Sequence, residues 1–177
     1  MPSLRLRRSV RTETFSAGRR FRIGDICIRS VRLPHDAPQV ALVFESKETT
    51  VGLVTDLGHV PKGLPRFLGD CETLLLESNH DLDMLASGPY PPVLKRRVGG
   101  SLGHLSNAQA GDLLAYLPQV PKRVVLMHLS ETNNAPQLAT SSAQAALGHG
   151  KTQLLVAHQR RPLSLAATGD SQLRFAL

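Results

Sequence analysis

The sequence of 177 residues has little aromatic material, with no tryptophan, two tyrosines and five phenylalanines. So few rings exclude a broad surface on which many bases of a nucleic-acid strand could stack. Its two cysteines, Cys27 and Cys71, lie far apart, which excludes a disulfide framework or a cysteine-rich zinc knot. No apolar run reaches the roughly 18 residues of a membrane span or forms a secretory signal core. We therefore expect a cytoplasmic protein without a membrane segment.

Positive charge is concentrated at the N-terminus. Residues 1–32 contain nine arginines against Glu13 and Asp25, which accounts for the whole net charge of +7 and leaves the remaining chain neutral. Residues 1–20 show no sustained hydrophobic period and predict a basic arm outside the fold, which would comprise residues 21–177. Three interpretations of this arm stay open: a polyphosphate-binding tail, a transit-like peptide, or a start region that does not belong to the fold.

Hydrophobic periodicity in the remaining chain predicts a layered α/β protein. Two hairpin-like pairs of strands come first, and strands then alternate with helices, which favours a sheet flanked by helices. The expected strands are 21–33 (a hairpin in itself), 39–46, 49–56, 71–78, 122–130, 152–159 and 163–168. The expected helices are 80–87, 92–99, 106–117 and 133–148, and residues 62–70 form a short helix or a turn. No internal repeat is visible.

Three polar residues lie at or near the ends of expected strands, and in such sheets functional side chains gather beyond the carboxyl ends of the strands. His35 follows the first hairpin, Asp56 follows the apolar run "VGLVT", and His128 follows "VVLM". Any one of these histidines could be an ordinary core or capping residue. Together with a bridging carboxylate, histidine nitrogens form the usual donor set for zinc, manganese or iron in hydrolytic sites. The pattern therefore predicts a metal site.

Two further segments carry candidate residues. The stretch "ESNHDLD" offers Glu77, His80, Asp81 and Asp83, of which the two aspartates are typical of a helix cap and an acidic first helical turn. His80 could face a substrate or support a metal ligand. The stretch "GHLSN" places His104 just before a helix, where backbone donors favour a phosphate and where a histidine could protonate a leaving oxygen. A loop histidine packed on its own helix is the alternative.

The strings "PHDA", "TDLGHV", "LLLESNHDLDML", "SGPYPPVLKRRV", "GHLSN" and "VVLMHLSETNNAPQLA" together resemble the metallo-β-lactamase superfamily. They are most similar to its YycJ-type branch of phosphodiesterases, whose members are regarded as DNA exonucleases, and more loosely similar to the ribonuclease Z group. The resemblance covers about residues 20 to 150. It implies an αββα sandwich with two divalent metal ions, zinc or manganese, at one edge.

The resemblance also implies roles for single residues. His35 and His128 match histidine ligands of the family, and Asp56 matches the carboxylate that bridges the two metal ions. His104 matches the proton donor of the ribonuclease Z relatives, and His80 matches a motif position that we count as a second catalytic candidate. The implied reaction is hydrolysis of phosphodiesters by metal-bound hydroxide, with DNA ahead of RNA as the substrate.

One departure from the family is large, because the motif His-x-His-x-Asp-His occurs nowhere in the sequence. We therefore expect residues 21–177 to form the C-terminal half of the sandwich, a fragment with impaired activity. Half a sandwich exposes an apolar sheet face, which favours self-association or a complementing N-terminal half. Two alternatives remain: a non-catalytic module that binds nucleic acid or a partner through its basic arm, and a hydrolase of thioesters or lactams.

Overall fold

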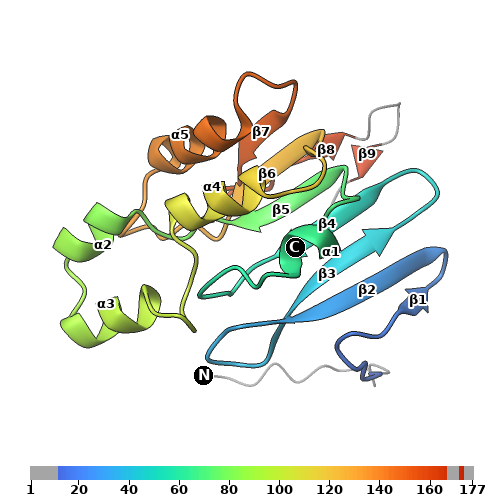
Figure 1. Ribbon diagram of the computed structural model, residues 1–177, viewed down its shortest axis with the longest axis horizontal. Helices are drawn as coiled ribbons and strands as arrows, with labels where there is room; N and C mark the ends of the chain where they lie inside the picture. The colour runs from blue at the N-terminus through green and yellow to red at the C-terminus, as the bar shows by residue number, and fades with distance from the viewer. Residues whose placement is uncertain (1–11, 167–171, 174–177) are drawn as a thin grey trace.

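The computed structural model describes residues 12–166 and 172–173, and its centre is one seven-stranded sheet (Figure 1). The strands lie in the sheet in the order in which they occur in the chain. They are Phe21–Ile23 (β1), Ile26–Leu33 (β2), Gln39–Glu45 (β3), Thr50–Val54 (β4), Thr73–Glu77 (β5), Arg123–Met127 (β6) and Gln153–Val156 (β7). Strands β1 to β4 pair antiparallel, and β4 to β7 pair parallel. This mixed sheet confirms the predicted α/β class.

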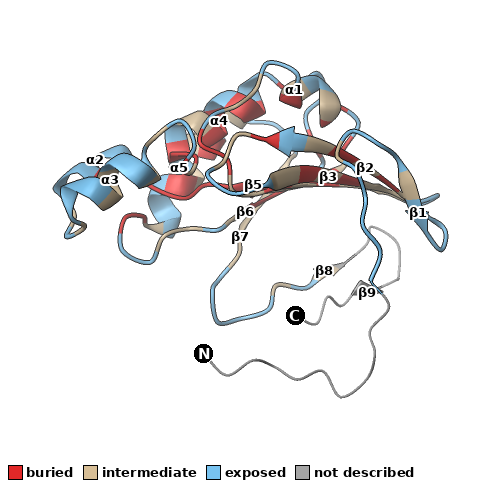
Figure 2. Ribbon diagram, turned by 90° about the horizontal axis from the view of Figure 1, so that it is seen from below, coloured by how far each residue is buried: buried red, intermediate tan, exposed pale blue. Residues whose placement is uncertain are grey.

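Helices cover one face of the sheet. They are Leu64–Phe67 (α1), Leu82–Ser87 (α2), Pro92–Val98 (α3), Asn107–Ala115 (α4) and Pro136–Leu147 (α5). Figure 2 shows α1, α4 and α5 on the same side, with α2 and α3 extending beyond one end of the sheet. Buried side chains of the sheet and of these three covering helices form one apolar core. This core anchors the parallel strands whose ends carry the candidate site.

The two halves of the sheet follow from how their strands are joined. Tight turns make β1 to β4 antiparallel: Gly24 takes a positive φ of 56° between β1 and β2, and the Ser46 hydroxyl accepts from the Glu48 and Thr49 amides between β3 and β4. Parallel strands need longer crossovers, which helices supply after β4, β5 and β6. The carboxyl ends of β4, β5 and β6 therefore meet at one edge.

The opposite face of the sheet carries an aligned apolar row. The register places apolar side chains from five neighbouring strands side by side: Leu42, Leu53, Leu75 and Leu155 are half-buried, and Val125 is 2% exposed. None of the five belongs to the buried core beneath the helices. Figure 2 shows no described helix on this side of the sheet, which carries the short strands Leu165–Ala166 (β8) and Gln172–Leu173 (β9) and irregular segments of the chain.

The ends of the chain depart most from the expected elements. Of the strand expected at 163–168, the structure shows only the two-residue β8, which pairs with β9 outside the main sheet. Residues 167 and 168 of that expected strand lie outside the described ranges. Residues 1–11 of the expected arm lie outside them too. Within the arm, the Phe15 ring stacks on Phe21 and the Gly18 amide donates to the Ser30 carbonyl. The division at residue 20 stays a prediction. Among the described residues no helix is long and apolar enough to cross a membrane.

Candidate metal centre

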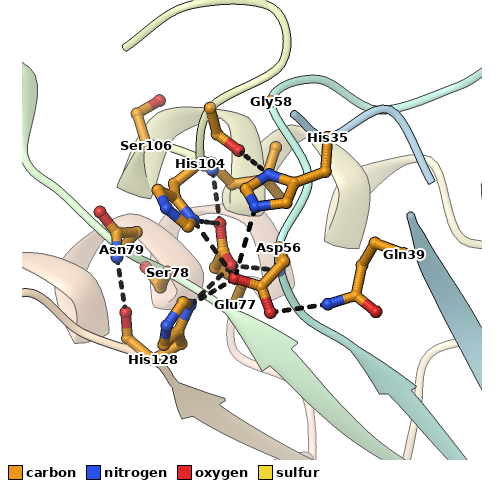
Figure 3. Close-up of polar contacts among 12 residues, drawn as sticks. His35, Gln39, Asp56, Gly58, Glu77, Ser78, Asn79, His104, Ser106 and His128 are labelled. Carbon is orange, nitrogen blue, oxygen red and sulfur yellow. Dashed lines mark hydrogen bonds and ion pairs between the residues drawn. The ribbon is translucent and has the colours of Figure 1, made fainter. Parts of the chain in front are cut away.

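The centre lies at the carboxyl ends of β4, β5 and β6. Asp56 comes two residues after β4, Glu77 is the last residue of β5, and His128 directly follows β6. Asp56 and His128 have positive φ angles of 62° and 58°, a conformation that few residues other than glycine adopt. The two strands thus end in left-handed turns, and both side chains reach the same point as Glu77 (Figure 3).

Asp56 stands at the middle of three histidines. Its Oδ1 lies 4.0 Å from His35 Nε2, 3.7 Å from His104 Nδ1 and 3.7 Å from His128 Nδ1. The Gln39 side-chain amide fixes the other oxygen, Oδ2, with a hydrogen bond of 2.9 Å. The structure therefore brings together the three residues predicted to bind metal and His104, which was predicted to donate a proton. They come from four separate parts of the chain.

Glu77 lies beneath this group; the sequence offered it as a candidate residue but assigned it no role in the site. Its side chain is completely buried, and its Oε1 accepts from the Leu105 amide at 2.7 Å. Its Oε2 accepts from the Asp56 amide and from His128 Nδ1, the latter at 2.9 Å. Burial alone would raise the pKa of Glu77, but the His104 and His128 rings and the Asp56 amide outweigh it and lower the pKa to about 2. Glu77 is therefore a buried anion.

Two histidines are oriented by bonds through one ring nitrogen. His35 Nδ1 donates to the Gly103 carbonyl at 2.8 Å, so its Nε2 faces two carboxylates, Asp36 at 3.2 Å and Asp56 at 4.0 Å. His128 Nδ1 donates to Glu77, and this hydrogen bond raises the pKa of His128 against the opposing effect of burial. A ring nitrogen bonded to a carbonyl or carboxylate, with the other nitrogen left open, is the usual arrangement of metal-binding histidines.

The donor set fits a divalent metal ion. Asp56, Glu77, His104 and His128 each offer a ligand atom, and these atoms lie within 4.8 Å of one another. His104 Nδ1 is buried and forms no hydrogen bond with any described residue, although Glu77 Oε1 lies 3.4 Å away. A buried polar atom without a partner calls for an explanation, and imidazole nitrogens beside carboxylates suit zinc or manganese. His35 lies at the margin of this group: its Nε2 is 4.0 Å from Asp56 Oδ1, and the centre of its ring lies 5.0 Å from that of His104.

Hydrogen bonds among asparagines hold the loops that carry the centre. Asn79 donates from its side chain to the His128 carbonyl at 2.9 Å. Deeper in the protein, Asn107 and Asn134 bond each other, and Ser78 bonds to Asn107. Sequence reasoning did not assign these residues to the site. The available indication was that asparagine recurs in "ESN", "LSN" and "TNN", each near a strand end or helix start.

His80 lies apart from the group described above. Its side chain is 1% exposed, burial lowers its pKa, and its Nδ1 has no hydrogen-bond partner among the described residues. It does not line the cavity next to the centre. Its backbone carbonyl accepts from the Asn107 amide, which ties the loop after β5 to the start of α4. The catalytic role that the sequence suggested for His80 stays a prediction.

A cavity of about 450 Å³ opens beside the centre. His35, His104 and His128 form one wall, and α3 with the loop before it forms another. Asp36 stands between the two walls: its Oδ1 lies 3.2 Å from His35 Nε2 and its Oδ2 accepts from Arg97 Nε at 2.7 Å. The hydrogen bond from Arg97 lowers the pKa of Asp36. The cavity is large enough for a small ligand or one end of a polymer.

This combination of a mixed sheet, covering helices and histidines around a strand-end carboxylate defines a metallo-hydrolase fold, and comparison with known proteins identifies the family. The model of the β-lactamase superfamily domain matches residues 2–129, and the chain belongs to that family. It is similar to the YycJ-type branch of the metallo-β-lactamase fold, as the sequence resemblance implied.

Two curated relatives and one solved structure illustrate the match. The chain is 32% identical over 153 residues to exodeoxyribonuclease YycJ of Bacillus anthracis, covering 84% of this chain and 58% of the relative. It is 36% identical over 144 residues to exodeoxyribonuclease WalJ of Streptococcus pneumoniae, covering 77% and 53%. The metallo-β-lactamase fold protein YhfI from Bacillus subtilis superposes with a TM-score of 0.63 at 17% identity, covering 81% and 51%, and shares the fold. The chain thus spans about half the length of the curated relatives it matches.

Proposed function

We propose that this chain carries part of the active site of a metal-dependent phosphodiesterase that hydrolyses DNA. The observation that carries the proposal is the convergence of three histidine nitrogens within 4.0 Å of Asp56 Oδ1 at the edge of a cavity. The curated relatives are named exodeoxyribonucleases, which supports DNA as the substrate.

His35, Asp56 and His128 would hold a divalent ion, zinc or manganese. Such an ion supplies a Lewis acid that withdraws charge from a phosphate and makes water more acidic. The protein orients these donors: Gln39 holds the Asp56 carboxylate and Glu77 holds the His128 ring. His104 would donate a proton from Nε2 to the leaving oxygen, because its Nδ1 is turned toward the carboxylates of Asp56 and Glu77.

The activity of this chain by itself should be low. The sequence lacks the His-x-His-x-Asp-His motif, so the described residues offer one bridging carboxylate and few histidines. We propose that they hold one ion per chain or less, whereas two-metal hydrolysis needs two ions about 4 Å apart. A second polypeptide that supplies further donors should raise both the metal content and the rate.

The proposal is tested by measuring metal content and DNA hydrolysis together. Asp56→Asn is the sharpest variant, because asparagine tolerates the positive φ at this position and removes only the negative charge. Asp70→Asn, the same change at an exposed residue, is the matched control. Each purified chain is dialysed against manganese or zinc, analysed by elemental mass spectrometry, and incubated with single-stranded DNA.

We expect bound metal in the wild type and in Asp70→Asn, and its loss in Asp56→Asn. Any hydrolysis should follow the metal and fall at least about a hundredfold, the scale reported for lost electrostatic stabilisation at an active site. Equal metal content and equal hydrolysis in Asp56→Asn and the wild type would refute the assignment of this centre.

A further inference from the structure

The cavity beside the metal centre has a second wall that the proposed chemistry does not use. Tyr90 lies in the loop before α3, and Leu94, Arg97 and Val98 lie on α3 itself; all four line the cavity. Figures 1 and 2 show α2 and α3 extending past the carboxyl ends of β5 and β6, away from the body of the sheet. Anything that enters the centre from that side passes α3.

Arg97 is the cation on this wall. Its Nε donates to Asp36 at 2.7 Å, while its two Nη groups bond no described residue, and 68% of its side chain is exposed. The ion pair therefore holds the guanidinium at the cavity but leaves a pair of donors open. Two parallel N–H donors match the geometry of a phosphate, which an arginine binds through both at once.

The neighbouring cations on α3 differ from Arg97 in position. Lys95 is committed to the Ala86 carbonyl through its Nζ, at 2.6 Å. Arg96 is exposed, has no partner among the described residues and does not line the cavity. Only Arg97 therefore combines positive charge with a place beside the centre, and Arg96 is a control of equal charge one residue away.

Tyr90 supplies a flat apolar surface on the same wall. It is half-buried, lines the cavity and stands between Pro89 and Pro91, which restrict the backbone on both sides. Tyr116, the other tyrosine of this aromatic-poor chain, caps α4 and does not reach the cavity. The base of one nucleotide can stack on this ring. Its phosphate can accept hydrogen bonds from the two open guanidinium N–H groups of the neighbouring arginine.

We propose that Tyr90 and Arg97 form a nucleotide subsite that holds the end of a DNA single strand next to the metal centre. The inference rests on the proposed function and specifies the form of its substrate. A single strand is favoured because each of its bases can unstack and offer a face to Tyr90, whereas in a duplex only the outermost base pair has a free face. The subsite would keep one nucleotide in place while the adjoining phosphodiester lies at the histidines.

The test measures binding without catalysis. A fluorescently labelled DNA single strand of about 12 nucleotides, within the usual range of single-strand binding sites, is titrated with each protein in EDTA over a salt series. Anisotropy gives the Kd and its salt dependence. The variants are Arg97→Gln with Arg96→Gln as its control, and Tyr90→Ala with Tyr90→Phe as its control. Arg97→Lys keeps the positive charge but loses the paired guanidinium donors, and it replaces Arg97→Gln in the test if Arg97→Gln does not fold.

We expect Arg97→Gln to weaken binding about tenfold at low salt and to lower the slope of log K against log salt by about one. Arg96→Gln should leave both unchanged. Tyr90→Ala should weaken binding by at least about fivefold, the lower end of what one base–aromatic stack contributes, while Tyr90→Phe keeps it. Arg97→Lys should weaken binding with little change in slope.

Two other results would be decisive against the subsite. If the wild type binds and Arg97→Gln behaves as Arg96→Gln does, or Tyr90→Ala as Tyr90→Phe does, the subsite is refuted while the metal-dependent function stands. If the wild type does not bind the single strand at all, the subsite and the DNA substrate are both refuted. Tighter binding to a duplex of the same sequence would also overturn the proposed single-strand end.

Discussion

Glu77 shows how one residue organises the centre from below. Its two carboxylate oxygens accept from Leu105, from His128 and from the Asp56 amide, so one buried anion connects three strand and helix ends. We predict that Glu77→Gln lowers the free energy of unfolding of the metal-free protein by about 2 kcal/mol at pH 7, because charged hydrogen bonds are lost in a buried place. Urea unfolding in EDTA measures this.

The effect of Glu77→Gln on the free energy of unfolding should also depend on pH. The pKa of Glu77 is about 2 in the fold against an ordinary value of 4.5, so its ionisation stabilises the fold above pH 4.5 and that stabilisation is lost as pH falls toward 2. The difference between Glu77→Gln and the wild type should therefore shrink between pH 5 and pH 3. Glu72→Gln, at an exposed ion pair with Lys122, should change stability by less than about 1 kcal/mol. A difference at Glu77 that is constant with pH would contradict the assignment.

Cys71 allows a prediction about reactivity. Its thiol is 5% exposed, and burial raises its pKa to about 11, so at pH 8 it is a neutral thiol beneath the helices. We expect iodoacetamide at pH 8 to modify half-buried Cys27 in the native protein and to leave Cys71 unmodified. In urea both should react. Peptide mass spectrometry separates the two sites, and rapid native modification of Cys71 would show that α1 opens readily.

At the scale of elements, the loop between α3 and α4 places His104. A Cβ at Gly103 would stand 2.2 Å from the Arg97 and Val98 carbonyls, which belong to the end of α3 and cannot rotate away. Gly103 also accepts the bond that orients His35. We predict that Gly103→Ala destabilises the protein by about 3 kcal/mol, the upper range for overpacking, and lowers the metal content. Gly63→Ala, where a Cβ meets open space, should do neither.

Most of the elements and part of the centre could be predicted from the sequence. Apolar runs and alternating apolar residues indicate strands β2 to β7, because both faces of each strand are wholly or partly buried. The ends of the parallel strands bring Asp56 and His128 together, as predicted. Glu77 was a candidate without an assigned role, because its place in "LLLES" resembles that of any strand residue. Its burial comes from the loop at Leu105, 28 residues away, which covers it only in the folded chain. The sequence pattern around a residue does not predict a contact with a residue so far along the chain.

Considered as a whole, the molecule is a sheet with helices on one face and an apolar row on the other. Each strand from β2 to β7 alternates so that one set of side chains enters the core and the other faces the opposite side. Contiguous apolar surface of that kind beyond a few hundred Å² marks an interaction site or a tendency to aggregate. The half-buried leucines of this row therefore offer a surface on which a second copy of the chain can pack.

We predict that the protein self-associates through this face. Leu42 and Leu53 are paired neighbours at one end of the row, so Leu42→Thr with Leu53→Thr removes apolar surface while keeping residues that favour strands. Tyr116→Thr, at a tyrosine 74% exposed on the helical side, is the matched control. In sedimentation velocity the wild type and the control should show a sedimentation coefficient that rises with concentration, and the double variant a smaller rise. A wild type that stays monomeric over the whole series would show that this face does not bind a second copy.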